Sequence, residues 1–502
     1  MKAAAVFSDN MVLQRGKNVR IFGSCKSQCR NITVNVPELA VSAEAVIEGG
    51  EWMAVLPPMK ECGKCSVVIA SENEKIVFSN VAVGEVWLAG GQSNMEFELQ
   101  NDKHGREELS QCSGEDVRLY YTPNCEMCDE KLAQAEKDSG WRLPDEESAK
   151  CWSAVGYYFA KELSRRLGVT VGIIGCNWGG TSASAWMNEK YLRQDERLRL
   201  YMDDYDKAVE GKSTKQMIAE YDEYTEYHAQ WEKKLQKCYS DNPDIKWEEV
   251  LKICGENRYP GPLGCKNPMR PCGLYETMVK RVHPYTLAGF IYYQGESDDH
   301  RPDTYYTLLK TLIENWREDW MDDTLPFMLV QLPMFKYEAA PDYKHWCKIR
   351  EAQMKVFRTV KNTGIASVLD CGEFNNIHPT DKSQVGLRLY LQAMYHVYGD
   401  TDAMKAFPPI YKAHEISGNK IRVHFSFCDG FELRGELDGF EIAGADKVFH
   451  NASAEIIGDM IELHSDKVHS PHYARFKWTN YAEVTLFGRN GIPVPPFTTL
   501  RD

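Results

Sequence analysis

The chain has 502 residues, of which 43% are hydrophobic and 26% are charged, and it carries a formal net charge of −14. That length suits about two or three folded domains, and the acidic balance without a basic cluster excludes a surface built to bind nucleic acids. No apolar stretch approaches the roughly 18 residues of a membrane-spanning helix, and the negative charge argues against binding to anionic membranes.

The N-terminal residues 1–16 contain one lysine and only a short apolar run. This run is shorter than the hydrophobic region of a secretion signal with its cleavage site. We therefore expect a cytoplasmic protein, with an export signal removed from in front of this sequence as the alternative.

The chain contains 16 cysteines, a modest density for its size. We expect most of them to be buried free thiols in a reducing compartment rather than disulfides. Two CxxC pairs, Cys62 with Cys65 and Cys125 with Cys128, could together bind zinc. Their separation does not match the spacing of a zinc ribbon or finger, so we expect no metal.

Residues 1–80 are predicted to form an N-terminal β-rich domain. Short alternating runs, such as 18–23 and 31–36, are separated by clusters of Gly, Asn and Lys. No stretch in this region is long and periodic enough to predict a helix.

From residue 81 to residue 404, apolar strand-like segments alternate with amphipathic stretches. Strands are expected at 84–90, 169–178, 287–295, 326–332 and 365–370. Helical spacing occurs in 155–167, 309–316 and 385–397, and Gly168 follows the first of these as a typical helix-terminating residue. This alternation predicts an α/β fold with a mostly parallel sheet covered on both faces, in which ligands bind beyond the carboxyl ends of the strands.

A helical insertion is predicted at about 188–255. Apolar and aromatic residues recur there at helical spacing, with Ser213 as a candidate N-cap: Met217, Tyr221, Tyr224, His228, Trp231 and Leu235. The favoured interpretation is a cover over one side of the core, and the alternative is a lid over an active site. Residues 405–502 return to alternating β-type runs and are expected to form a C-terminal β-rich domain.

Ser93 is the candidate nucleophile. It follows the expected strand 84–90 in the segment GGQSNM, where Gly90 and Gly91 permit a tight turn. A serine at such a strand-to-helix junction would be exposed above the sheet. The alternative is a serine that caps a helix.

Three further segments follow other expected strands. Gly180 lies in WGGTSASAWM (178–187), Gln294 in YYQGESDD (292–299) and His378 in NNIHPTDKSQVGLRL (375–389). A serine needs a base within hydrogen-bond reach, and the topology would bring His378 to the same edge of the sheet. An amide side chain such as Gln294 can donate to a developing oxyanion. Ordinary turns are the alternative for the segments of Gly180 and Gln294, and a structural role is the alternative for His378.

Taken in this order, the four segments resemble the SGNH hydrolase superfamily, and more closely its sialate O-acetylesterase family. The flanking segments 7–23, 273–279, 350–353, 439–449 and 495–499 also resemble that family. The resemblance implies an SGNH-type, flavodoxin-like three-layer sheet domain with flanking β-rich segments. It implies a serine esterase that removes acetyl groups from sugars without a metal or organic cofactor.

The resemblance also implies roles for individual residues. Ser93 would be the nucleophile and His378 the general base, while the backbone N–H groups of Ser93 and Gly180 and the side chain of Gln294 would form the oxyanion hole. Ser93 would attack the acetyl carbonyl, the sugar hydroxyl would leave, and water would then hydrolyse the acetyl-enzyme.

One position departs from the superfamily pattern. The aspartate often found three residues before the histidine is replaced here by Asn375. The candidates for orienting His378 are Glu373, Asp370 or a backbone carbonyl. Glu296 is a further candidate for this role, although an ordering role for its own loop is favoured, and it is also a candidate for contact with substrate.

Three functions are compatible with these features. The favoured substrate is an O-acetylated sialic acid, whose carboxylate would be recognised by an arginine, with Arg270 as one candidate. A different acetylated sugar, such as acetylxylan, is the second hypothesis. The third is a non-catalytic carbohydrate-binding protein on a hydrolase scaffold. The sequence does not indicate an oligomeric state.

Overall fold

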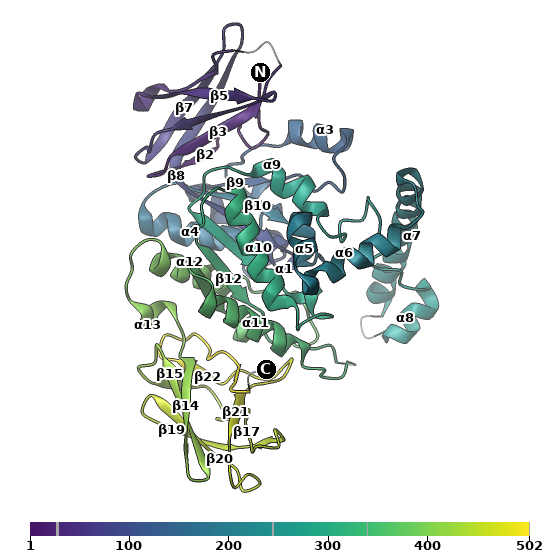
Figure 1. Cartoon of the computed structure of the whole chain (residues 1–502), viewed down its shortest axis with the longest axis vertical. Coiled ribbons are helices and arrows are strands. Elements are labelled where there is room, and N and C mark those ends of the chain that lie inside the picture. Colours follow the sequence, from purple (N-terminus) through teal and green to yellow (C-terminus); the bar gives the residue numbers. More distant parts are fainter. Residues whose placement is uncertain (27–29, 243–244, 339, 501–502) are drawn as a thin grey trace.

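The fold is described from a computed structural model, which describes residues 1–26, 30–242, 245–338 and 340–500. Three parts follow one another along the longest axis of the molecule (Figure 1). The N-terminal strands lie at one end, an α/β body lies in the middle, and the C-terminal strands lie at the other end.

The middle part is built on a parallel sheet with the strand order β9-β10-β8-β11-β12-β13. These strands are β8 (Lys75–Gly91), β9 (Val117–Tyr121), β10 (Val171–Asn177), β11 (Gly289–Tyr293), β12 (Phe327–Gln331) and β13 (Thr363–Ser367). After β8 the chain first adds β9 and β10 on one side of β8, and it later adds β11, β12 and β13 on the other side. The carboxyl end of β8 is therefore the switch point at which such sheets bind ligands.

Helices cover both faces of this sheet. On one face α4 (Ala154–Leu167) packs against α12 (Ser383–His396), and on the other α10 (Tyr305–Asp319) packs against α11 (His345–Thr359). Trp87 contacts Phe159 of α4 with a centroid separation of 5.1 Å, and Phe290 contacts Trp316 of α10 at 5.4 Å.

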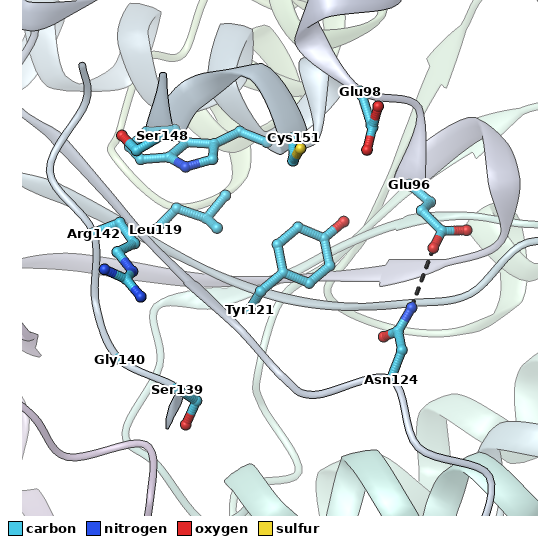
Figure 2. Close-up of a pocket in the computed structure, with 11 residues that line it drawn as sticks. Glu96, Glu98, Leu119, Tyr121, Asn124, Ser139, Gly140, Arg142, Ser148 and Cys151 are labelled. Atoms are coloured by element: carbon cyan, nitrogen blue, oxygen red, sulfur yellow. Dashed lines mark hydrogen bonds between the residues drawn. The ribbon is translucent and has the colours of Figure 1, made fainter. Parts of the chain in front are cut away.

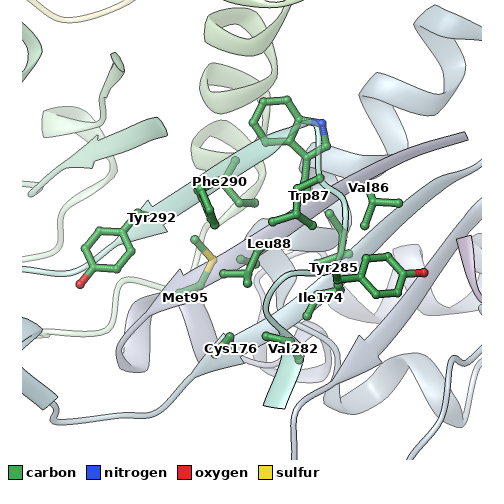
Figure 3. Packing of buried hydrophobic residues seen from close by; sticks show 14 of the residues in the cluster. Val86, Trp87, Leu88, Met95, Ile174, Cys176, Val282, Tyr285, Phe290 and Tyr292 are labelled. Atoms are coloured by element: carbon green, nitrogen blue, oxygen red, sulfur yellow. The ribbon is translucent and has the colours of Figure 1, made fainter. Parts of the chain in front are cut away.

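Figure 3 shows the buried side chains of β8, β10 and β11 that form the centre of this core. The predicted three-layer α/β fold is confirmed. Gly168 ends α4 in the left-handed conformation, as expected. The edge strand β9 and helix α11 were not among the elements expected from the sequence.

The N-terminal part is an antiparallel sheet that shares a strand with the middle part. Its strands are β1 (Lys2–Ala3), β3 (Val19–Ser24), β4 (Thr33–Val36), β5 (Val41–Glu48), β6 (Glu51–Leu56) and β7 (Cys62–Ala70), with β2 (Val12–Gln14) pairing to β8 in parallel. The first half of β8 pairs with β7, and the second half enters the parallel sheet. The expected boundary at residues 80 and 81 therefore falls inside one continuous strand.

Helices α5 (Glu189–Gln194), α6 (Glu196–Val209), α7 (Thr214–Asp241) and α8 (Trp247–Cys254) occupy the region of the expected insertion, and α7 and α8 lie at one side of the molecule (Figure 1). The hydroxyl of Ser213 accepts a hydrogen bond from the backbone N–H of Gln216, so the predicted N-cap of α7 is confirmed. The shorter helices are α1 (Ser93–Glu96), α2 (Gly105–Gln111), α3 (Glu130–Asp138), α9 (Lys280–Val282) and α13 (Ala403–Ala406). Of the helices in the described ranges, none is both long enough and apolar enough to cross a bilayer.

The C-terminal part has its own hydrophobic core, which includes Ile421, Phe440 and Phe476. Its strands are β14 (Ile410–Ser417), β15 (Lys420–Ser426), β16 (Phe431–Leu433), β17 (Phe440–Ala443), β18 (Phe449–Asn451), β19 (Ser453–Ile457), β20 (Met460–His464), β21 (Tyr473–Phe476), β22 (Leu486–Gly488) and β23 (Phe497–Thr498). The buried guanidinium of Arg350 on α11 joins this part to the middle one. It donates to the carbonyls of Leu332 and Pro333 and to those of Thr479 and Asn480.

Candidate active site

Ser93 lies directly beyond the carboxyl end of β8, and a sharp turn places it there. Gly91 has a φ of +138°, and a β-carbon on it would lie 2.1 Å from the carbonyl oxygen of Tyr293. Only glycine fits such a position. Helix α1 begins at Ser93 with Gln92 as its N-cap residue, so the hydroxyl of Ser93 does not serve as the cap. The first N–H groups of a helix have no acceptor within it, which leaves the N–H of Ser93 available to a ligand.

His378 is the hydrogen-bond partner of this serine. Its Nε2 lies 2.8 Å from Oγ of Ser93, and it comes from the loop between β13 and α12. Partial burial and, secondarily, the positive charge of Lys382 hold the pKa of His378 below its usual value. The imidazole is therefore neutral near pH 7 and can accept the proton of Ser93.

Neither expected carboxylate reaches the other ring nitrogen of His378. Asp370 forms a two-pronged salt bridge with Arg388, at 2.5 and 2.8 Å. Glu373 accepts hydrogen bonds from Thr380 and from the side chain of Asn376. Among the described residues, no group accepts a hydrogen bond from Nδ1 of His378. The expectation that Asp370 or Glu373 orients the imidazole directly is therefore wrong in this geometry.

Instead, the backbone around His378 is fixed. The carboxylate of Glu373 holds Nδ2 of Asn376 at 2.7 Å, and Oδ1 of Asn376 accepts the N–H of His378 at 3.0 Å. Glu373 also accepts the N–H of Thr380 at 2.7 Å, so it bridges both sides of the histidine. Glu373 therefore orients His378 through the loop rather than through the imidazole.

A buried polar network joins this loop to the serine turn. Asn94 donates to the carbonyl of Ile377 at 3.0 Å and to Glu296 at 2.6 Å, and it accepts from Nζ of Lys382 at 2.6 Å. Burial lowers the pKa of Lys382 to about 8 despite the attraction of Glu296, and burial raises the pKa of Glu296. Sequence reasoning missed Asn94 and Lys382, although each lies within a segment that it singled out.

The loop that carries Gly180 is anchored beside Ser93. The N–H of Gly179 donates to Oε2 of Glu96 at 2.6 Å, and a β-carbon on Gly179 would lie 3.2 Å from Cβ of Ser93. Two residues beyond Gly180, the hydroxyl of Ser182 donates to Asp298 at 2.6 Å. The N–H of Gly180 donates to no described residue, so it remains free for a ligand, as expected of an oxyanion donor.

Gln294 does not fit the expected role of oxyanion donor. Its side chain is 1% exposed, and its Nε2 donates to Asp298 at 2.7 Å and also contacts Gln92 and Thr181. Its Oε1 accepts from Tyr305. The amide is thus fully engaged in holding the loops together. Asp298, which the sequence did not single out, is the centre of this arrangement.

The two candidate substrate contacts lie in different surroundings. Glu296 is 5% exposed and is bonded to Asn94, so it does not face a ligand. Nε of Arg270 donates to the carbonyl of Cys265 at 3.0 Å, and its side chain packs against Gly273. The burial of Glu296 therefore contradicts its expected contact with substrate, whereas a contact of Arg270 with substrate stays a prediction.

A pocket of about 380 Å³ begins one helical turn beyond Ser93, at Glu96 (Figure 2). Glu96 and Asn124 stand at one end of it and Arg142 at the other, with the ring of Tyr121 between them. Burial raises the pKa of Glu96 in spite of its hydrogen bonds from Gly179 and Asn124. Arg142 is the one positively charged side chain among the described residues that line the pocket. It forms no ion pair with another described residue.

Cys62 and Cys65 lie on β7, whereas Cys125 and Cys128 precede α3. Within the described ranges, no three His, Cys, Asp or Glu side chains are grouped so that they could share a metal ion.

Comparison with known proteins agrees with this geometry. The family model of carbohydrate esterases described as sialic acid-specific acetylesterases matches residues 83–254 and 266–396, which is more than half of the chain. The chain belongs to the sialic acid-specific acetylesterase family. The predicted resemblance is confirmed, and this acetylesterase is a carboxylic ester hydrolase.

Individual relatives agree with the family assignment. The acetylesterase is 27% identical over 404 residues to the sialate O-acetylesterase of Mus musculus, covering 74% of this chain and 68% of the relative. It is 25% identical over 489 residues to the sialate O-acetylesterase of Homo sapiens, covering 89% and 81%. A solved carbohydrate acetylesterase from Xanthomonas citri superposes with a TM-score of 0.78 at 26% identity, over the whole of both chains.

Proposed function

We propose that this protein removes O-acetyl groups from sialic acids by a serine mechanism. The observation that carries the proposal is the 2.8 Å contact between Oγ of Ser93 and Nε2 of His378, at the switch point of the sheet. The names of the mouse and human relatives support sialate as the sugar.

The chemistry proceeds in two steps. His378 takes the proton of Ser93 as Oγ bonds to the acetyl carbon, and the N–H groups of Ser93 and Gly180 stabilise the negative oxygen. The bond between the acetyl carbon and the sugar oxygen then breaks, and His378 returns the proton to that oxygen. His378 then takes a proton from water as the water oxygen bonds to the acetyl carbon. The bond from that carbon to Oγ of Ser93 breaks, His378 returns the proton to Oγ, and acetate leaves.

Arg142 supports an acidic sugar as the substrate. A sialic acid carries a carboxylate, and a guanidinium binds a carboxylate through paired hydrogen bonds. The pocket that contains Arg142 starts at Glu96, so the sugar of an acetyl ester bound at Ser93 could extend into it.

The direct test is acetate release from O-acetylated sialic acids and from acetylxylan by the wild-type protein and by Ser93→Ala. We expect release from the sialic acids by the wild type and a loss of at least about a thousandfold in the variant. Equal hydrolysis by Ser93→Ala would contradict the assignment of the nucleophile. Acetate release from acetylxylan but not from the sialic acids would agree with the serine mechanism and contradict sialic acid as the substrate.

A further inference from the structure

Tyr259 brings a hydroxyl group from the helical insertion to the edge of the active site. A β-carbon on Gly180 would lie 2.1 Å from the hydroxyl oxygen of Tyr259, so this oxygen rests directly against Gly180. Gly180 itself has a φ of +72°, and its free N–H is one of the two oxyanion donors of the proposed mechanism. The phenol therefore lies beside the place where the ester carbonyl would bind.

Helix α7 contacts the ring of Tyr259 through a row of aromatic side chains. His228 lies between Tyr224 and Trp231, with centroid separations of 5.4 and 6.2 Å and nearly parallel planes, and Tyr259 contacts His228 at 6.3 Å. The hydroxyl of Tyr227 anchors the same loop by donating to the carbonyl of Glu256 at 2.6 Å. The long helix thus positions a side chain at the active site rather than only covering the core.

The hydroxyl of Tyr259 is available to a ligand. The residue is 51% exposed, and its hydroxyl forms no hydrogen bond with a described residue. Partial burial raises the pKa of Tyr259, so the phenol keeps its proton at neutral pH and can donate it in a hydrogen bond. The amide of Gln294, by contrast, has no such freedom.

Tyr259 also lies outside the part of the chain that the family model matches. That match stops at residue 254 and resumes at residue 266. Tyr259 therefore reaches Gly180 from the interval between the two matched ranges.

We propose that Tyr259 is a catalytic residue of the esterase site, whose hydroxyl donates a hydrogen bond to the ester group held at the N–H of Gly180. This role rests on the proposed function, because it requires an ester attached to, or approaching, Ser93. The ring and helix α7 fix the donor, and the hydrogen bond strengthens as negative charge develops on the ester oxygen.

The test compares Tyr259→Phe with the wild type on 4-nitrophenyl acetate, an ester without a sugar. Tyr239→Phe is the matched control, because it removes an exposed hydroxyl near the C-terminal end of the same helix α7. We expect Tyr259→Phe to lower kcat by about tenfold or more with little change in KM, and Tyr239→Phe to keep kcat within about twofold.

Other outcomes overturn the proposal. Wild-type kcat in Tyr259→Phe would do so, and so would an equal loss in Tyr239→Phe, which would indicate a general effect on the insertion. A wild type that hydrolyses 4-nitrophenyl acetate but no sialic acid ester would contradict the proposed substrate and leave this test intact. A wild type inactive on both would contradict the esterase function and the role of Tyr259 together.

Discussion

The side-chain amide of Asn94 donates a hydrogen bond of 3.0 Å to the main-chain carbonyl of Ile377, the residue before His378. Asn94 is itself the residue after Ser93. One buried side chain therefore sets the distance between the two segments that carry the proposed nucleophile and the proposed base. The same amide also donates a hydrogen bond to Glu296 through Nδ2 and accepts one from Lys382 at Oδ1.

Replacing Asn94 should damage both stability and catalysis. Asn94→Ala leaves the buried Glu296 and Lys382 without their shared partner, which we expect to lower the free energy of unfolding by roughly 3 kcal/mol. It also frees the carbonyl of Ile377, so kcat should fall by about a hundredfold as His378 shifts. Chemical denaturation and hydrolysis of 4-nitrophenyl acetate measure the two effects. The exposed Asn101→Ala serves as the control, and an Asn94→Ala enzyme with wild-type kcat would contradict this role.

The pH dependence of activity should follow the lowered pKa of His378. The imidazole must be neutral to accept the proton of Ser93, and a lowered pKa keeps it neutral to a lower pH than usual. The acid limb of kcat/KM should therefore have its midpoint below the ordinary histidine value of about 6.5. A profile of 4-nitrophenyl acetate hydrolysis between about pH 4.5 and 8 measures it, and a midpoint above 6.5 would contradict the prediction.

The two carboxylates before the histidine should differ in effect. Glu373→Ala removes the acceptor that holds Asn376 and Thr380, so we expect kcat to fall by about tenfold to a hundredfold. Asp370→Asn breaks only the salt bridge with Arg388, so kcat should stay within about threefold while stability falls by about 1–3 kcal/mol. Kinetics and thermal unfolding of both variants check this contrast. The reverse order of kcat values would restore Asp370 as the residue that orients His378.

The sequence predicted the sheet and the serine–histidine pair for the same physical reason. Buried parallel strands are continuous apolar runs, and a residue that follows such a run must emerge at the carboxyl edge. Ser93 and His378 could therefore be brought together from topology alone. The direction of a polar side chain does not follow from topology. Gln294 was therefore expected to face the ligand, whereas its amide is buried and donates a hydrogen bond to Asp298.

The contacts that were missed all depend on segments that meet only in the folded chain. Nothing in the sequence places Tyr259 against Gly180 or Asn94 against Ile377. The periodicity of residues 217–235 predicted helix α7 with its cap, but left open whether the insertion covers the core or contributes to the site. The contact between His228 of α7 and Tyr259 indicates that the insertion contributes to the site, because Tyr259 in turn lies against Gly180.

Arg142 gives a test of the sugar that is independent of the catalytic residues. Arg142→Gln removes the cation from the pocket beside Glu96 and should raise KM for an O-acetylated sialic acid by about tenfold, because a paired guanidinium–carboxylate contact is lost. It should not change hydrolysis of 4-nitrophenyl acetate, which has no carboxylate. Arg165→Gln is the control, since Arg165 pairs with Glu115 at the far end of α4. An equal change of KM for both esters in Arg142→Gln would mean that the pocket does not bind the sialic acid carboxylate. That result would favour a neutral acetylated sugar as the substrate.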